Sequence, residues 1–340
     1  MKLITFTVPC YNSSEYMEKC IQSLLHAGND AEIILVNDGS YDDTGLICDK
    51  YAAEYPDIIK VIHQQNSGHG EGINQGLRCA QGLYYKVFDS DDWADISALQ
   101  KLMAKLRDFS IIGDLPDIII CNYIYDQISN GKIIPMRYVN VFPQSSLFYW
   151  KDIKRFRLSQ YLLMHSVIFK TSLLHEQRIE LPKHTFYVDN LFAYTPLPYV
   201  RTLFYLNADL YHYCIGRVNQ SVNEKVMTAR VDQQIRITKL MIDSHDIRLI
   251  KRKEPKLAGY MINYMSIMMM ISSILLILDN VTENKQKQSE LWGYLKKVNP
   301  YLYTRLRYTS LSGITAKPCF FGRKIIIFLY RLANKRYGFN

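Results

Sequence analysis

Apolar and polar positions along the first 125 residues follow two periods in turn, one typical of strands and one typical of helices. Short β-branched and aromatic runs predict strands at Leu3–Val8, Glu32–Asn37, Ile58–His63, Tyr84–Phe88 and Asp117–Tyr125. Apolar residues at helical spacing predict helices at Glu15–His26, Asp43–Tyr55 and Ile96–Asp108. Because strands alternate with helices, the pattern predicts an α/β fold whose mostly parallel sheet is covered on both faces.

The pattern changes further along the chain. Asn130-Gly131 is a hairpin turn signal between Tyr125 and Ile133. Beyond Gln144 the alternation fades into tyrosine-rich sequence, and from Met227 onward the pattern is helical. The sequence therefore predicts a helical C-terminal region after the α/β part.

Polar residues follow three of the predicted strands at the point where each ends. Pro9–Asn12 follows the first strand, Asn37–Ser40 the second, and Asp89–Asp92 the fourth. Ligands of open α/β sheets bind outside the carboxyl ends of the strands. Any one of these segments is an ordinary turn of Asn, Asp, Gly and Ser. Their coincidence at one edge of one sheet favours a binding site.

These motifs resemble those of the family 2 glycosyltransferases, of the bacterial polysaccharide and cell-surface glycan type. The similarity rests on Val8–Asn12, Val36–Ser40 with Asp42, Asn66–Gly76 and Asp89–Trp93, over residues 3 to about 125 and more loosely to about Val222. It implies a Rossmann-like GT-A fold with a catalytic domain at 1–222. That domain would divide into a nucleotide-sugar half at 1–125 and an acceptor half at 126–222, and a helical region would occupy 223–340.

The resemblance also implies which residues hold the donor. In this chain they are Pro9, Tyr11, Asn12, Glu15, Asp38, Asn66, Gly68, Asp89, Ser90 and Arg217. A Tyr11 ring that stacks on uracil and an Asp38 carboxylate that accepts its N–H favour a UDP-sugar over a purine donor. Asp38 has an alternative role in its own turn, and Glu15 in favouring a helix N-terminus. Gly72-Ile73-Asn74 departs from the Ala-Arg-Asn run common in the family, so one arginine contact to the donor is missing.

Three aspartates within four positions repel one another unless a cation lies between them. By the resemblance Asp89 and Asp91 hold Mn²⁺ or Mg²⁺, hard cations that take oxygen ligands and neutralise a departing diphosphate. His212 is a further candidate ligand, with a packed strand histidine as the alternative. For Asp92 and Asp95 the alternative is the capping of the helix that starts at Ile96.

Glycosyl transfer to a hydroxyl also needs a base that takes the acceptor's proton. The candidate is Asp189 in TFYVDNLFAY, an acid within an apolar and aromatic stretch where burial would raise its pKa. Asp152 and Asp126 are rivals, and a helix N-cap is the structural alternative for Asp189.

The net charge of +9 is confined to one end of the chain. Residues 291–340 contain ten Lys and Arg and neither Asp nor Glu. In the final segment Phe321, Ile325, Phe328, Leu329 and Leu332 share one helical face, and Lys324, Arg331 and Lys335 share another. This pattern predicts an interfacial helix on an anionic membrane, with docking on its own domain as the alternative. It argues against a nucleic-acid partner.

Two further features bear on location. The seven cysteines are scattered without a CxxC pair, and the N-terminal apolar run, broken by Pro9, is too short for a signal peptide. Tyr260–Leu278 is nineteen residues without a charge, which suits either a membrane span or a buried helix. We expect a cytoplasmic protein, peripheral on the inner face of the cell membrane.

Together these features predict an inverting, metal-dependent transferase that moves a hexose or N-acetylhexosamine from a UDP-sugar to an acceptor hydroxyl. The acceptor would be a glycan or a lipid-linked glycan in capsule, exopolysaccharide or wall polymer synthesis. The alternatives are a polyprenyl-phosphate sugar synthase and a non-catalytic nucleotide-sugar-binding scaffold.

Overall fold

The computed structural model describes residues 1–340 except 128–130, 158–159, 217–222, 280, 317–319 and 338–340. The chain divides into two compact units. Unit 1 comprises Met1–Asp126, Gly131–Lys154 and Leu162–Cys214, and unit 2 comprises Ile215–Asn340 with Gln127–Asn130 and Arg155–Tyr161.

Unit 1 is built on a mixed sheet. In the described part of the chain its strands are β1 (Ile4–Cys10), β2 (Ala31–Asn37), β3 (Ile59–His63), β4 (Tyr84–Val87), β5 (Trp93–Ala94), β6 (Ile118–Gln127), β7 (Lys132–Met136), β8 (Leu147–Phe148), β9 (Val167–Lys170) and β10 (Leu203–Ile215). Their order is β3-β2-β1-β4-β9-β6-β10-β5, with β7 beside β6 and β8 beside β10. The predicted parallel pairing holds for β3, β2, β1 and β4. Strand β9 runs antiparallel to both β4 and β6, so the sheet is mixed.

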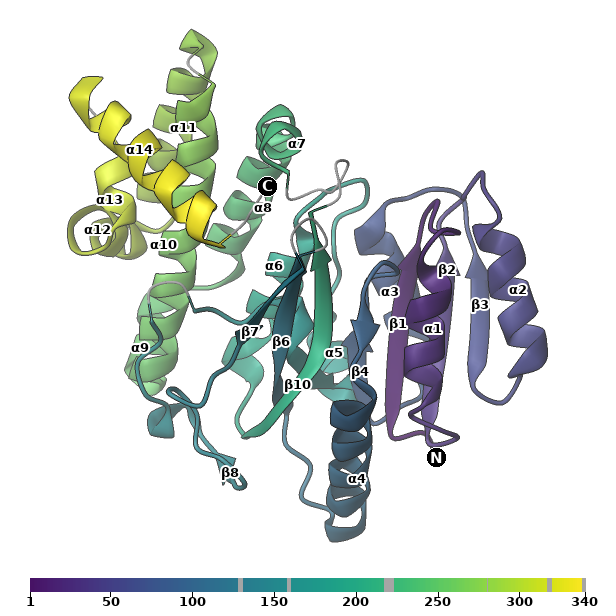
Figure 1. Ribbon diagram of the computed structural model, residues 1–340. Coiled ribbons are helices and arrows are strands. Elements are labelled where there is room, and N and C mark those ends of the chain that lie inside the picture. The colour runs from purple at the N-terminus through teal and green to yellow at the C-terminus, as the bar shows by residue number, and fades with distance from the viewer. Residues whose placement is uncertain (128–130, 158–159, 217–222, 280, 317–319, 338–340) are drawn as a thin grey trace. The chain divides into compact units, whose positions relative to one another are not determined.

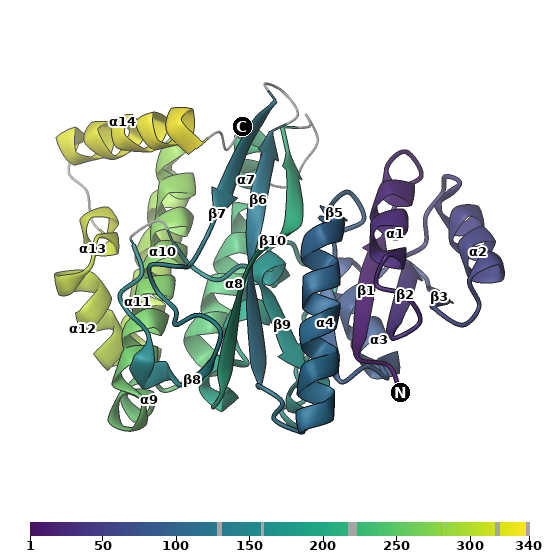
Figure 2. The ribbon, with the colours of Figure 1, turned by 60° about the horizontal axis from the view of Figure 1, so that its bottom comes forward.

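Helices cover both faces of the parallel strands, as predicted (Figures 1 and 2). They are α1 (Met17–Leu25), α2 (Thr44–Glu54), α3 (His69–Cys79) and α4 (Ile96–Ile112), with α5 (Thr171–Glu176) and α6 (Val188–Tyr194) later in unit 1. Helix α3 packs on β1 and β2 on the opposite face from α1. The α/β class is confirmed, and so are the predicted strands and helices to within a few residues at their ends.

Two boundaries differ from the sequence analysis. Strand β1 continues through Pro9 to Cys10, because its ladder with β2 extends to the pair Cys10 and Asn37. No element was predicted for Gly68–Gly82, a segment with closely spaced glycines, and α3 lies within it. Its Gly72 and Gly76 face Pro9 and Thr7 so closely that a Cβ at either position would clash. These glycines lower helix propensity, and they are needed because the helix must approach β1 closely.

Unit 2 is helical, as predicted. Its helices are α7 (Glu224–Ala229), α8 (Val231–Ser244), α9 (Ile247–Lys253), α10 (Pro255–Leu278), α11 (Thr282–Val298), α12 (Pro300–Thr309), α13 (Ser312–Thr315) and α14 (Phe320–Tyr337). Helix α10 packs against α8, α9, α11, α12, α13 and α14. It is long and apolar enough to cross a membrane, but 61% of its most apolar window is buried inside the protein. Its burial is that of a core helix.

Gly82 provides a test of how the parallel strands pack. A Cβ at Gly82 would clash with the backbone of Ile4 and Thr5, and the Gly82 N–H donates to Thr5 Oγ1 at 2.9 Å. We therefore expect Gly82→Ala to lower the free energy of unfolding by about 1–3 kcal/mol through overpacking. Urea denaturation measures this. The control is Gly293→Ala, at an exposed position in α11 with nothing within 4 Å, which should raise stability by up to about 1 kcal/mol. Equal effects of the two variants would contradict the proposed clash.

Candidate active site

The three predicted polar segments meet at the carboxyl edge of the parallel strands. The ladders pair Cys10 with Asn37 and Thr7 with Val87, so β1, β2 and β4 end side by side. Beyond them Ser13 and Ser90, which follow β1 and β4, share a hydrogen bond of 2.8 Å between their hydroxyls. The polar segments that were expected at one edge of the sheet therefore lie together in the structure.

A group of three potential ligands lies directly after β4. The carboxylates of Asp89 and Asp92 and the imidazole of His165 offer ligand atoms that all lie within 4.8 Å of one another. His165 is 4% exposed, and its Nδ1 has no hydrogen-bond partner among the described residues. Burial lowers the pKa of His165 to about 4. The imidazole is therefore neutral at pH 7 and offers a lone pair.

The pKa values of the two aspartates of this group are shifted in opposite directions. The Tyr211 hydroxyl donates to Asp92 Oδ2 at 2.6 Å and the Cys214 N–H donates to Oδ1 at 2.8 Å. Burial and the nearby charges of Asp91 and Asp89 nevertheless raise the pKa of Asp92 well above its usual value. Burial also disfavours the ionised form of Asp89, but the hydrogen bond from His69 and the nearby positive charge together outweigh it and lower the pKa of that carboxyl.

His69 is the first residue of α3, and its Nε2 lies 2.8 Å from Asp89 Oδ1. Burial disfavours the imidazolium, but the hydrogen bond with Asp89 and the charge of that carboxylate raise the pKa of His69. The sequence analysis did not assign this contact. It joins the start of α3 to the end of β4, and a histidine in the glycine-spaced segment was its only local signal.

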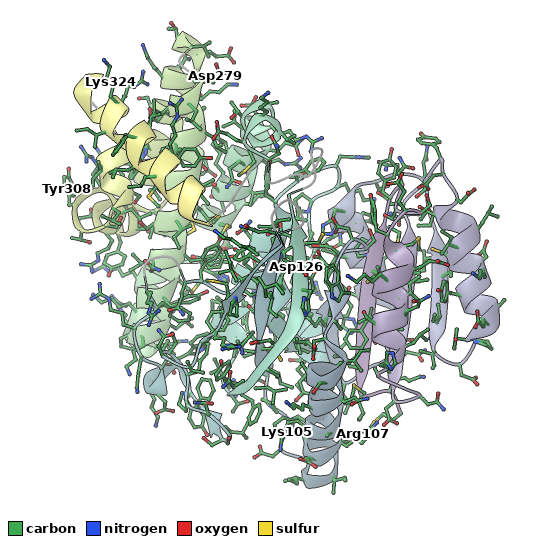
Figure 3. The ribbon with its side chains drawn as sticks, in the orientation of Figure 1. Lys105, Arg107, Asp126, Asp279, Tyr308 and Lys324 are labelled. Carbon is green, nitrogen blue, oxygen red and sulfur yellow. The ribbon has the colours of Figure 1, made fainter. Side chains whose placement is uncertain are left out.

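The predicted metal residues are only partly brought together. Asp91 lies in the same turn as Asp89 but does not belong to the group of three. His212 lies on β10, where its ring stacks on Trp93 with centroids 5.1 Å apart. Its Nδ1 is 3.5 Å from an Oδ2 of Asp126 on β6, which Figure 3 labels. The structure thus groups Asp89 with His165 and with Asp92, for which helix capping was the alternative expected from the sequence. Asp95 is the cap of α4, accepting from the Ala98 N–H at 2.8 Å.

Asp38 organises the loop before α3. Its buried carboxylate accepts from the N–H groups of Ser67 and Gly68, both at 2.8 Å, and from Gln64 Nε2 at 2.6 Å. The Asn66 amide donates to the Asp38 backbone oxygen at 3.0 Å. Asp38, Asn66 and Gly68 of the predicted donor set therefore form one hydrogen-bonded unit that fixes the turn into α3.

The remaining predicted donor residues lie in β1, between β1 and α1, or outside the described residues. Pro9 is buried in β1, and Glu15 is exposed ahead of α1. Asn12 has a φ of 48° and accepts from the Tyr41 N–H at 2.9 Å. Tyr11 is 47% exposed, so its ring is accessible to a ligand. Arg217 lies outside the described residues.

Asp189 lies in the first turn of α6, and it is not the N-cap, which is Tyr187. Burial, followed by the negative charge of Asp89, raises the pKa of Asp189 to about 6. The expected rise is confirmed, and its second cause shows that the field of Asp89 reaches Asp189. The rivals have other partners: Asp152 accepts from the Tyr149 N–H at 2.9 Å, and Asp126 pairs with His212.

Comparison with known proteins agrees with this arrangement. The sequence profile of glycosyl transferase family 2 matches residues 5–172. A putative glycosyltransferase of *Bacillus subtilis*, EpsH, is 28% identical over 219 residues, which cover 62% of this chain and 60% of that protein. The glycosyltransferase GlyA of *Streptococcus pneumoniae* is 30% identical over 241 residues, 67% of this chain but 33% of that protein. The chain thus matches less than two thirds of the length of either relative.

Among solved structures, *S. aureus* TarS 1–349 in complex with UDP-GlcNAc is similar in fold. Its TM-score is 0.68 at 20% sequence identity, over 98% of this chain and 92% of that one. The likeness includes the helices of the C-terminal region, and the fold is of the GT-A type. The profile match identifies residues 5–172 as a glycosyl transferase family 2 domain.

Proposed function

We propose that this protein is an inverting, metal-dependent glycosyltransferase that moves a sugar from a UDP-sugar to an acceptor hydroxyl. The observation that carries the proposal is the contrast between two carboxyls that interact electrostatically. Asp89 is ionised, whereas the pKa of Asp189 is raised to about 6. Two carboxyls whose environments give them different pKa values are suited to different chemical roles. The family match and the TarS complex with UDP-GlcNAc support a nucleotide-sugar donor.

The residues near Asp89 fit a divalent cation. Carboxylates and a neutral imidazole with an unpartnered nitrogen are ligands that Mn²⁺ accepts, and Mg²⁺ accepts the carboxylates. Asp89 with Asp91 or Asp92 would hold the ion, with His165 or His212 as the nitrogen ligand. A bound cation would offset the charge that develops on the diphosphate leaving group. Burial raises the pKa of Asp92, and a cation would offset the further rise that comes from the charges of Asp91 and Asp89.

The chain's own residues supply the other roles. The exposed Tyr11 ring stacks on the uracil, and the loop fixed by Asp38 presents Asn66 and Gly68 to the nucleotide. Pro9, Asn12, Glu15 and Ser90 complete the proposed donor site. Asp189 accepts the proton of the acceptor hydroxyl as that oxygen attacks the anomeric carbon. A single direct displacement of this kind inverts the anomeric configuration.

We further propose that α14 binds an anionic membrane surface and that the acceptor is a glycan or lipid-linked glycan. Ile325, Phe328, Leu329 and Leu332 are each more than half exposed, while Ile326 on another face is buried. Lys324 projects from the same helix (Figure 3). An exposed apolar stripe beside basic residues, without acids, suits the interface of an anionic bilayer. A location on the inner face of the cell membrane follows from this proposal.

A chelator should abolish sugar transfer, and added Mn²⁺ or Mg²⁺ should restore it. Asp89→Asn should lower turnover by about 10²-fold or more, because a neutral amide cannot offset a divalent charge. Release of UDP from a panel of UDP-sugars, UDP-GlcNAc first, measures both effects. The matched control is Asp95→Asn, which keeps the α4 cap because Asn caps as well as Asp. Full activity in chelator would refute the metal dependence, and the absence of turnover under every metal would favour the non-catalytic scaffold.

Asp189→Asn should leave the affinity for the UDP-sugar unchanged but lower transfer on the order of 10²-fold or more, the scale of a lost general base. A carboxyl with a pKa of about 6 is protonated below that pH and then accepts no proton. The wild-type rate should therefore fall as the pH is lowered through about 6, and the variant should lose this limb of the pH profile. Asp152→Asn is the control and should retain both the rate and the profile. Loss of donor affinity in Asp189→Asn would instead assign the residue to donor binding.

The full-length protein should sediment with vesicles that contain anionic phospholipid but not with neutral vesicles. Raised salt should weaken the binding, since each basic group near the surface contributes about 1 kcal/mol. Phe328→Glu should release the protein because it places a charge on the exposed apolar stripe. Ile111→Glu, at an 84% exposed position on α4, is the matched control and should bind as the wild type does. If Phe328→Glu bound the anionic vesicles as strongly as the wild type does, α14 would not be the element that binds the membrane.

A further inference from the structure

A lysine is buried in the middle of β4, three residues before Asp89. Lys86 is fully buried within the β-branched and aromatic run that predicts this strand. Its amino group donates to the backbone oxygen of His165 at 2.8 Å and to those of Met164 and Val167, both at 3.4 Å. The rings of Phe88 and Tyr211 lie 5.2 and 5.1 Å from its Nζ.

The carbonyls that Lys86 binds belong to one short turn. Met164–Ser166 forms a 3-10 turn that leads into β9, and β9 pairs with β4 through Tyr84 with Lys170 and Tyr85 with Phe169. The closest of the three carbonyls belongs to His165. The imidazole of the same residue lies within 4.8 Å of the ligand atoms of Asp89 and Asp92. Lys86 therefore holds the backbone of the residue whose side chain faces the two carboxylates.

Stability alone does not account for a lysine at this position. Burial of an ammonium carries a desolvation cost, and replacing buried charged groups by apolar residues of similar size is often neutral or stabilising. A leucine or methionine would fill the same space between Phe88 and Tyr211. Neither could donate hydrogen bonds to three carbonyls at once. What the lysine adds is therefore a set of hydrogen bonds that fixes the conformation of the turn.

We propose that Lys86 is a positioning residue, which holds His165 so that its imidazole completes a three-ligand site for a divalent cation with Asp89 and Asp92. The inference rests on the proposed function. It adds a nitrogen ligand from outside the aspartate motif. Two carboxylates and one imidazole favour Mn²⁺ over Mg²⁺, because Mg²⁺ prefers oxygen ligands throughout. Groups that orient a metal ligand typically change metal affinity 10- to 100-fold when they are removed.

Mn²⁺ binding to the full-length protein, without donor, tests this inference. Pulsed EPR of the Mn²⁺-bound wild type should show nitrogen hyperfine coupling, and His165→Gln should remove it. Lys86→Met, which removes the ammonium and keeps a long unbranched side chain, should raise the Kd for Mn²⁺ by about tenfold or more and weaken the coupling. The control is Tyr84→Phe, on the same strand, which loses only a buried hydrogen bond of 3.0 Å to the Pro116 oxygen. It should lower the melting temperature and leave both Mn²⁺ readouts unchanged.

The outcomes separate this inference from the proposed function. Mn²⁺ bound with unchanged nitrogen coupling in His165→Gln would overturn the inference alone, and this holds even if Lys86→Met does not fold. A folded Lys86→Met variant with wild-type Kd and coupling would reduce Lys86 to a structural role and overturn it as well. A wild-type protein that binds no Mn²⁺ would overturn both the inference and the metal-dependent function.

Discussion

Repulsion between carboxylates at the end of β4 is the constraint around which the site is built. The turn after this buried strand carries Asp89, Asp91 and Asp92. The resulting negative charge is accommodated in two ways. His69 at the start of α3 stabilises Asp89 as an anion. Asp92, buried against the Tyr211 hydroxyl, has its pKa raised instead. Helix α3 and strands β4 and β10 are thus joined through the same few side chains, and the field of Asp89 extends to Asp189.

Local patterns in the sequence were sufficient to predict the parallel strands and the edge where they end. Strand periodicity and turn residues act over a few positions, and the order of strands and helices then limits the topology. Helix α3 could not be predicted in this way, because Gly72 and Gly76 lower helix propensity. What requires them is the close approach to Pro9 and Thr7, residues more than sixty positions earlier in the chain.

The grouping of the candidate site residues could be predicted where they lie within one motif, and not where it depends on distant segments. Asp89 and the raised pKa of Asp189 could be inferred from their own neighbours. His165 lies more than seventy residues after Asp92, and it meets the aspartates because β9 pairs with β4. Lys86 lies within the predicted strand Tyr84–Phe88, and the carbonyl of His165 that it binds is brought within reach by the same pairing.

The C-terminal helices show that hydropathy alone does not identify which apolar residues are exposed. Helix α10 is the more apolar segment, and the surrounding helices bury most of it, so its apolar character is explained by the core of unit 2. Helix α14 carries fewer apolar residues, yet Phe328 and Leu329 remain 66% and 55% exposed. Burial gives apolar surface a free-energy gain only where it is removed from water. The apolar surface that unit 2 leaves exposed to water therefore includes the stripe on α14. This stripe lies beside basic residues, which an anionic bilayer attracts.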